Sequence, residues 1–204
     1  KEGIPYYTAN TQPGDPKYKN MDDNLQINDA DKVAIGNGQP KHTGGFTNNF
    51  TYKNFDLNIF MTWSYGNDIL NANRMIFENP SSKQNTNMFA TYANRWTESN
   101  PYSDMPRAKA QGAGEYSSLY VEDGSFLKLK NITLGYTIPQ KLTKKFYVQK
   151  LRVYGSAQNL FCLSKYSGYD PEVSTAANNP MTPGLDWGAY PKSRIFTIGL
   201  DLQF

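Results

Sequence analysis

The sequence predicts an all-β fold, a segment of a transmembrane antiparallel β-barrel whose long extracellular loops contain short helices. Hydrophobic residues make up only 38% of the 204 residues and aromatic residues 14%, a composition typical of strands and polar turns rather than of a helical bundle. Several segments alternate apolar and polar residues, as strands with one apolar face do. Short turns between these segments alternate with very long loops, which is typical of outer-membrane barrels.

Charge and motif content exclude several function classes. The net charge of +3 comes without a basic stripe or a nucleic-acid-binding module, so no nucleic-acid partner is predicted. The single histidine, His42, is expected in a loop, and the single cysteine, Cys162, is expected to be a small apolar filler. Catalytic motifs of the GxSxG, HExxH, CxxC and Walker types are missing from the sequence, so we predict no catalytic residues and no enzyme.

Membrane crossing by a helix is also excluded, because no segment approaches the ~20 consecutive apolar residues that a spanning helix needs. Barrel strands need only ~9–11 residues each and alternate in polarity, so a barrel remains compatible with the sequence.

Five strands are expected from the alternation. The segments 46–52 and 55–65 form a hairpin around the two-residue turn Lys53-Asn54. A third strand lies within 119–138, where Leu127 and Leu129 break the parity of the following residues and predict a bulge near Lys130. A turn over 141–149 leads to the fourth strand at 150–165, and the fifth runs over 194–204.

Long irregular segments separate these strands. We expect extracellular loops at 1–42, 67–118 and 166–193. Within the second loop, Asp68 is the expected cap of a short helix that runs through Phe77. A further helical turn is indicated by three aromatic residues at spacings of three and four, namely Phe89, Tyr92 and Trp96.

The last strand is the strongest local feature of the sequence. Its apolar residues occupy every second position and form the expected membrane-assembly strand: Phe196, Ile198, Leu200, Leu202 and Phe204. An aromatic final residue is typical of barrels that insert into the outer membrane. If Phe204 is periplasmic, alternating strand directions place one aromatic girdle at Tyr52, Phe55 and Tyr136 and another at Trp63 and Tyr65.

The alternation also assigns the two faces. The lipid-facing set is expected to be Leu57, Ile59, Met61, Ile132, Leu134, Leu151, Val153, Ile198, Leu200 and Leu202. The lumen-facing set is expected to include Asp56, Asn58, Thr133, Arg152 and Asp201. Lys128 and Lys130 are expected near the outer leaflet, paired with lipid phosphates.

One segment of the first loop has the spacing of a degenerate calcium loop. Oxygen-bearing side chains occur at its ligand positions or beside them: Asn20, Asp22, Asn24, Gln26, Asn28 and Asp31. Position six is Leu25 where the sharp turn favours glycine, so a plain Asx-rich turn is the alternative. Apart from this calcium candidate, the sequence indicates no cofactor.

Four separated segments, in the same order, resemble SusC/RagA-type TonB-dependent outer-membrane transporters. They are Ser125–Pro139 (SFLKLKNITLGYTIP), Leu151–Phe161 (LRVYGSAQNLF), Lys165–Glu172 (KYSGYDPE) and Gly188–Pro191 (GAYP). Pro40 to Gly45, which leads into Phe46, and Tyr52 to Asp56 are similar as well. The resemblance extends from about Gly14 to Phe204 and implies that residues 1–204 are the carboxyl-terminal portion of such a receptor.

The resemblance implies a barrel of about 22 strands around an amino-terminal plug, which five strands cannot close. It further implies TonB-dependent uptake of oligosaccharides or peptides across the outer membrane of a Gram-negative bacterium. The implied partners are the plug and remaining strands of the transporter, a SusD-like surface lipoprotein, the TonB complex through the amino-terminal part, and outer-membrane lipid. The alternative is a soluble secreted β-sandwich that binds carbohydrate, which would not need detergent.

Overall fold

The computed structural model describes residues 5–22, 24–79, 85–175 and 181–204. Parts of the three expected loops (1–4, 80–84 and 176–180), and Asp23 within the calcium-like segment, lie outside the described residues. The chain divides into two compact units, which we call the strand unit and the loop unit. The strand unit comprises Gly38–Asp68, Asp123–Val173 and Tyr190–Phe204, and the loop unit comprises Lys1–Asn37, Ile69–Glu122 and Ser174–Ala189.

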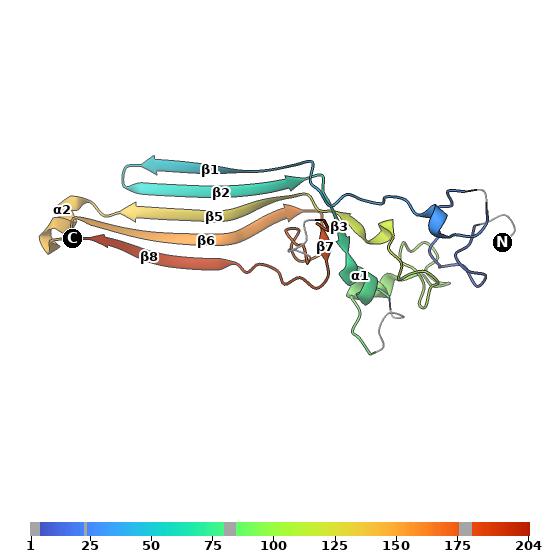
Figure 1. The fold of residues 1–204 in the computed structure, drawn as a ribbon. Coiled ribbons are helices and arrows are strands. Elements are labelled where there is room, and N and C mark those ends of the chain that lie inside the picture. Colours follow the sequence, from blue (N-terminus) through green and yellow to red (C-terminus); the bar gives the residue numbers. More distant parts are fainter. Residues whose placement is uncertain (1–4, 23, 80–84, 176–180) are drawn as a thin grey trace. The chain divides into compact units, whose positions relative to one another are not determined.

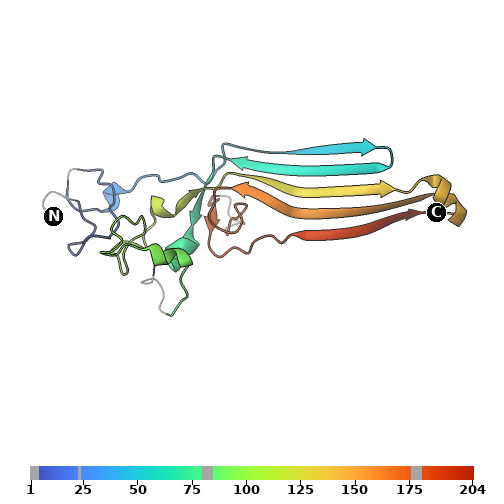
Figure 2. The ribbon, with the colours of Figure 1, turned by 180° about the vertical axis from the view of Figure 1, so that it is seen from behind.

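The strand unit is built on one five-stranded antiparallel sheet in the order β1-β2-β5-β6-β8 (Figures 1 and 2). Its strands are β1 (His42–Tyr52), β2 (Phe55–Tyr65), β5 (Phe126–Thr137), β6 (Lys150–Ser164) and β8 (Ile195–Gln203). All five expected strands are therefore confirmed. The third begins at Phe126 rather than near 119, because the preceding residues form the 3-10 helix η3 (Ser118–Tyr120) and the short strand β4 (Val121–Asp123).

The predicted hairpin and bulge are both present. Tyr52 pairs with Phe55 across the turn, where Lys53 adopts a left-handed φ of 54°. Between β2 and β5, Phe60 pairs with Asn131 but the next residue, Met61, pairs with Leu129. Lys130 is thus the extra residue, and the bulge returns Leu127 and Leu129 to the face of the later apolar residues of β5.

The connection from β5 to β6 is a helical turn. It consists of α2 (Gln140–Thr143) and the 3-10 helix η4 (Lys144–Phe146), and it reverses at Tyr147, whose φ is 60°. Backbone hydrogen bonds from Val148 to Thr143 and from Gln149 to Gln203 secure its end. The short turn predicted over 141–149 is therefore an ordered structure.

The loop unit has a small sheet in the order β4-β3-β7, in which β3 (Asp68–Asn71) runs parallel to β7 (Leu185–Asp186). The helix α1 (Ala72–Phe77) follows β3 directly. Its cap is the Asn71 side chain, which accepts a hydrogen bond from the backbone N–H of Arg74. The expectation that Asp68 caps this helix is wrong, because residues 68–71 are extended. The other 3-10 helices are η1 (Asp29–Asp31) and η2 (Ala90–Asn94), the latter within the expected aromatic stripe.

The loop unit holds most of the buried apolar side chains. Those described are Ile69, Ala72, Met75, Ala113 and Tyr120 in the loop unit, against Leu129 and Tyr166 in the strand unit. The first segment also docks on the second: Asp15 pairs with Arg107 at 2.6 Å, and the Tyr18 hydroxyl donates to the Gly112 carbonyl at 2.5 Å. Segments expected to be separate loops therefore form one packed unit. Among the described residues, no helix has the length and apolar character needed to cross a membrane.

Candidate functional site

One face of the five-stranded sheet is apolar and exposed. The register aligns Leu57 with Leu134, Ile59 with Ile132, and Val153 with Leu200 across neighbouring strands. All members of the expected lipid-facing set occupy this face: Leu57, Ile59, Met61, Ile132, Leu134, Leu151, Val153, Ile198, Leu200 and Leu202. On β8, Ile198 is 86% exposed and Leu200 is 68% exposed. Exposed apolar rows of this kind are typical of surfaces that contact another protein or a membrane.

Aromatic rings lie at both ends of the apolar face. At the turn end, the Phe55 and Tyr136 rings are 4.7 Å apart. At the other end, Trp63 packs over Gly44 and donates through Nε1 to Nδ1 of His42 at 3.1 Å. His42 also stacks on Tyr65 and is the first residue of β1, so its expected place in a loop is wrong. The two rows match the positions expected for girdles.

The opposite face of the sheet is polar and carries a ladder of amide side chains. Asn58 donates to Asn49 at 2.6 Å, and Asn131 donates to Asn58 at 3.3 Å and to Thr133 at 3.1 Å. The residues of the expected lumen-facing set share this face: Asp56, Asn58, Thr133, Arg152 and Asp201. Cys162 also lies here and is exposed, so its expected role as an apolar filler is wrong.

An arginine joins three strands on the polar face. Arg152 of β6 donates from Nε and Nη2 to both carboxylate oxygens of Asp56 on β2, at 2.9 and 2.5 Å, and from Nη1 to Asp201 on β8 at 2.9 Å. The side chain reaches Asp56 across β5 at Gly135, where an added Cβ would lie 2.5 Å from Arg152 Nε. Only glycine leaves that path open, and sequence reasoning assigned it no such role.

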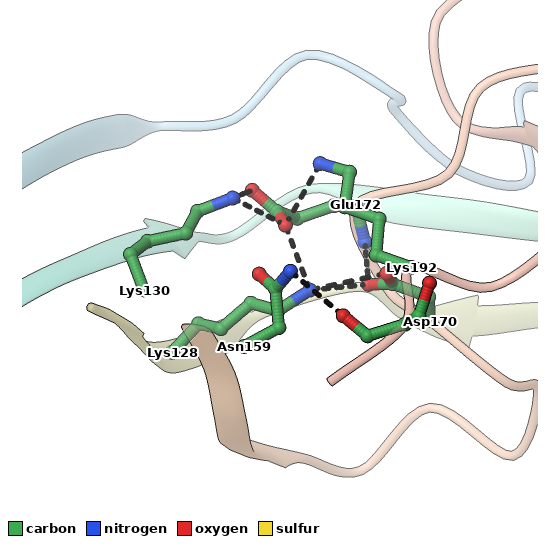
Figure 3. Close-up of polar contacts among 7 residues, drawn as sticks. Lys128, Lys130, Asn159, Asp170, Glu172 and Lys192 are labelled. Atoms are coloured by element: carbon green, nitrogen blue, oxygen red, sulfur yellow. Dashed lines mark hydrogen bonds and ion pairs between the residues drawn. The ribbon is translucent and has the colours of Figure 1, made fainter. Parts of the chain in front are cut away.

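A second charged cluster consists of Lys128, Lys130, Asp170, Glu172 and Lys192 (Figure 3). Lys128 of β5, only 4% exposed, contacts both carboxylate oxygens of Asp170 at 3.1 Å and Glu172 at 2.8 Å. The bulged Lys130 contacts Glu172 at 2.5 Å, and Lys192 contacts it at 3.1 Å. The expectation that Lys128 and Lys130 pair with lipid phosphates is wrong, because carboxylates of the chain already hold both.

The cluster anchors the segment after β6 and gives Glu172 an unusual acidity. Burial acts to raise the pKa of Glu172, but hydrogen bonds from the three lysines outweigh it and lower the pKa to about 2. The folded pKa lies below the ordinary 4.5, so the stability it contributes is complete above that pH and is lost as the pH falls toward about 2. Nearby, Asn159 donates to the Ser193 carbonyl at 3.1 Å.

The calcium-like segment is closed on itself by Asx turns. Side-chain oxygens of Asn20, Asp22, Asn24 and Asn28 accept from the backbone N–H two residues later, at 2.8 to 3.1 Å. The Asp31 carboxylate accepts from Met21 at 2.7 Å and from Asn28 at 2.8 Å, and these bonds lower its pKa. The Gln26 carbonyl accepts from the Asn28 side chain. Within the described residues, no group of three or more His, Cys, Asp or Glu is placed to hold a metal. This donor set fits an Asx-rich turn better than a calcium cage.

No family model matches the chain. Among curated proteins, TonB-dependent receptor P3 of Formosa agariphila is 35% identical over 207 residues, which cover 100% of this chain and 20% of that protein. TonB-dependent receptor SusC of Bacteroides thetaiotaomicron is 31% identical over 97% of this chain and 18% of its own length.

Among solved structures, the RagAB peptide transporter matches with a TM-score of 0.75 and 27% identity, over 89% of this chain and 19% of that one. The RagAB peptide importer in the "open-open" state matches with a TM-score of 0.70 and 29% identity over 81% of this chain. The chain therefore spans about a fifth of the length of the proteins it matches.

Proposed function

Because the chain is homologous to the SusC/RagA-type TonB-dependent receptors over about a fifth of their length, we propose that it forms barrel wall and outer loops of a nutrient importer. Receptors of this family are non-enzymatic outer-membrane proteins. The five strands belong to a transmembrane barrel of about 22 strands, completed by the plug and remaining strands of the receptor. Residues 1–42, 67–118 and 166–193 are extracellular.

One observation carries this proposal: the sheet exposes an apolar face and keeps its ion pairs on the other. The lipid side holds the exposed Ile198 and Leu200 of β8, and the lumen side holds the Arg152 cluster. A bilayer covers such a face without a second layer of protein. A soluble sandwich would need a second sheet packed on this face.

The cargo is an oligosaccharide or a peptide, taken up with a SusD-like surface lipoprotein and driven by the TonB complex. Similarity to SusC and to the RagAB peptide importer supports this class of import. Mass spectrometry of ligand that copurifies with the protein from its native membrane tests the cargo. A bound glycan or peptide supports the proposal, whereas a different ligand class contradicts it.

Substitution on the two faces of β8 tests the membrane placement. Leu200→Arg puts a charge near the middle of the strand on the lipid side, which costs ~2–4 kcal/mol at the bilayer midplane. Asp201→Asn, the matched control, alters only the lumen side. We expect the outer-membrane yield of Leu200→Arg to fall far below that of Asp201→Asn. Equal yields would contradict the assignment of the faces.

A further inference from the structure

The helical turn between β5 and β6 exposes a compact set of apolar and basic side chains. Leu142, Phe146 and Tyr147 are 57%, 76% and 91% exposed. Lys141, Lys144 and Lys145 are exposed beside them. Large apolar side chains seldom gather in this way on a turn that faces water alone.

Hydrogen bonds fix the backbone of the turn, and this backbone positions the exposed side chains. Thr143 is buried at its centre and accepts through its carbonyl from Val148. The left-handed Tyr147 ends the last helical turn, and Gln149 ties the chain back to β8. A rigid display loses little conformational entropy when it binds a surface.

The charge of the turn is uniformly positive. No acidic residue occurs between Ile138 and Lys150, and the ion pairs of the described residues do not involve the three lysines. The acidic groups near this end of the sheet, Asp56 and Asp201, are already paired with Arg152. The free charges therefore suit an anionic partner.

The turn lies at the end of the sheet that carries the Phe55–Tyr136 aromatic pair. It follows β5 just beyond Tyr136, whose ring packs against Phe55 in the aromatic row at that end. Figures 1 and 2 place α2 at the same end as the β1–β2 turn and the carboxyl terminus. If the apolar face lies in a bilayer, this turn lies at the level of the lipid headgroups.

We propose that the β5–β6 turn is an interfacial anchor that recruits anionic phospholipid of the adjoining leaflet. Leu142, Phe146 and Tyr147 insert among the headgroups and upper acyl chains, while the three lysines contact lipid phosphates. The anchor fixes the depth of this end of the sheet and gives the protein a preference for anionic lipid. This inference rests on the membrane placement proposed above.

Site-specific quenching tests the proposal in the membrane-reconstituted protein. A bimane label is placed at Gln149→Cys, with Cys162→Ser to remove the native thiol. Vesicles of phosphatidylcholine carry a small fraction of 5-doxyl lipid, either phosphatidylglycerol or phosphatidylcholine. We expect at least about fivefold stronger quenching by the phosphatidylglycerol probe, the enrichment that one lysine contact supplies.

Two triple variants distinguish the effect of the lysines in the turn from the effect of the protein's net charge. In Lys141→Gln/Lys144→Gln/Lys145→Gln, the ratio of quenching by the two probes should fall to about one. In the matched control Lys17→Gln/Lys19→Gln/Lys109→Gln, which changes the net charge equally at exposed lysines of the loop unit, the ratio should persist. About 1 M salt should abolish it as well, because the Debye length then shrinks to about 3 Å.

The outcomes also distinguish this inference from the function on which it rests. Equal quenching by both probes in the parent protein would overturn lipid recruitment while leaving the turn at the membrane. Absence of quenching by either probe would overturn both the anchor and the membrane placement. A preference that survives in the turn variant would assign the anionic lipid to another part of the protein and overturn the anchor.

Discussion

Replacing Gly135 with alanine should break the ion pair that links β2 to β6. The new Cβ would lie 2.5 Å from Arg152 Nε, Arg152 Nη2 and Asp56 Oδ1, so the guanidinium must move away. Alanine in place of a strand glycine would otherwise stabilise by roughly 0.5–1 kcal/mol. Two charge-assisted hydrogen bonds contribute roughly 1.5–3 kcal/mol each when shielded. The Arg152 and Asp56 side chains are 20% and 37% exposed, so solvent screening reduces the two bonds to roughly 2 kcal/mol together.

The net loss for Gly135→Ala is therefore about 1 kcal/mol, measured as a lower urea midpoint of the protein folded in vesicles. Gly155→Ala is the matched control on the neighbouring strand, because a Cβ there meets only the Thr197 carbonyl oxygen at 4.0 Å. That variant should be unchanged or slightly more stable.

A double-mutant cycle isolates the cause. In an Arg152→Ala background, no guanidinium occupies the space above Gly135, so Gly135→Ala should become neutral or stabilising. The expected coupling between the two positions is about 2 kcal/mol. Equal effects of Gly135→Ala and Gly155→Ala, or a penalty of Gly135→Ala that persists without Arg152, would show that the Arg152–Asp56 pair does not need glycine at position 135.

Three further predictions concern the loops. Glu172→Gln should destabilise the protein at pH 7 by on the order of 3 kcal/mol. It should also remove most of the stability loss between pH 4.5 and about 2, which urea titrations at several pH values measure. The control Glu98→Gln, at an exposed site, should change neither the stability nor its pH dependence. Calcium at about 1 mM should leave hydrogen exchange of residues 20–31 unchanged, because Asx turns already engage their side-chain oxygens; protection by calcium that Asp31→Asn abolishes would identify a calcium loop instead. Asn71→Ala should remove the cap of α1 at a cost of about 1 kcal/mol, with faster exchange at Arg74, and equal exchange rates would exclude the cap.

The strands could be predicted because their information is local. Alternation with period two specifies which side chains share a face, whatever lies on either side of the sheet. The parity break at Leu127 and Leu129 located the bulge at Lys130, since one extra residue is the simplest way to restore the face. Both aromatic rows and the exposed face of β8 follow from the same rule.

The loops could not be predicted in the same way, because contacts distant in sequence decide their structure. The Asp15–Arg107 ion pair joins residues 92 positions apart in the chain, and no periodic pattern in the sequence predicts it. Asn71 rather than the expected Asp68 caps α1, because residues 68–71 pair as a strand before the helix begins. This strand pairing depends on residues distant in sequence, so the local pattern around Asp68 does not predict it.

The sheet, the division of its faces and the family resemblance depend on near neighbours or ordered motifs, so they can be predicted from the sequence of this protein. The partners of its charged side chains come from segments far apart in the chain, so they are visible only in the folded molecule. The sequence predicts lipid phosphates as partners of Lys128 and Lys130, but the segment after β6 places Asp170 and Glu172 against them. The role of Gly135 likewise became visible only with Arg152 crossing above it. A buried charge needs an oppositely charged or hydrogen-bonding partner, and the folded chain rather than the spacing of residues in the sequence determines which group that is.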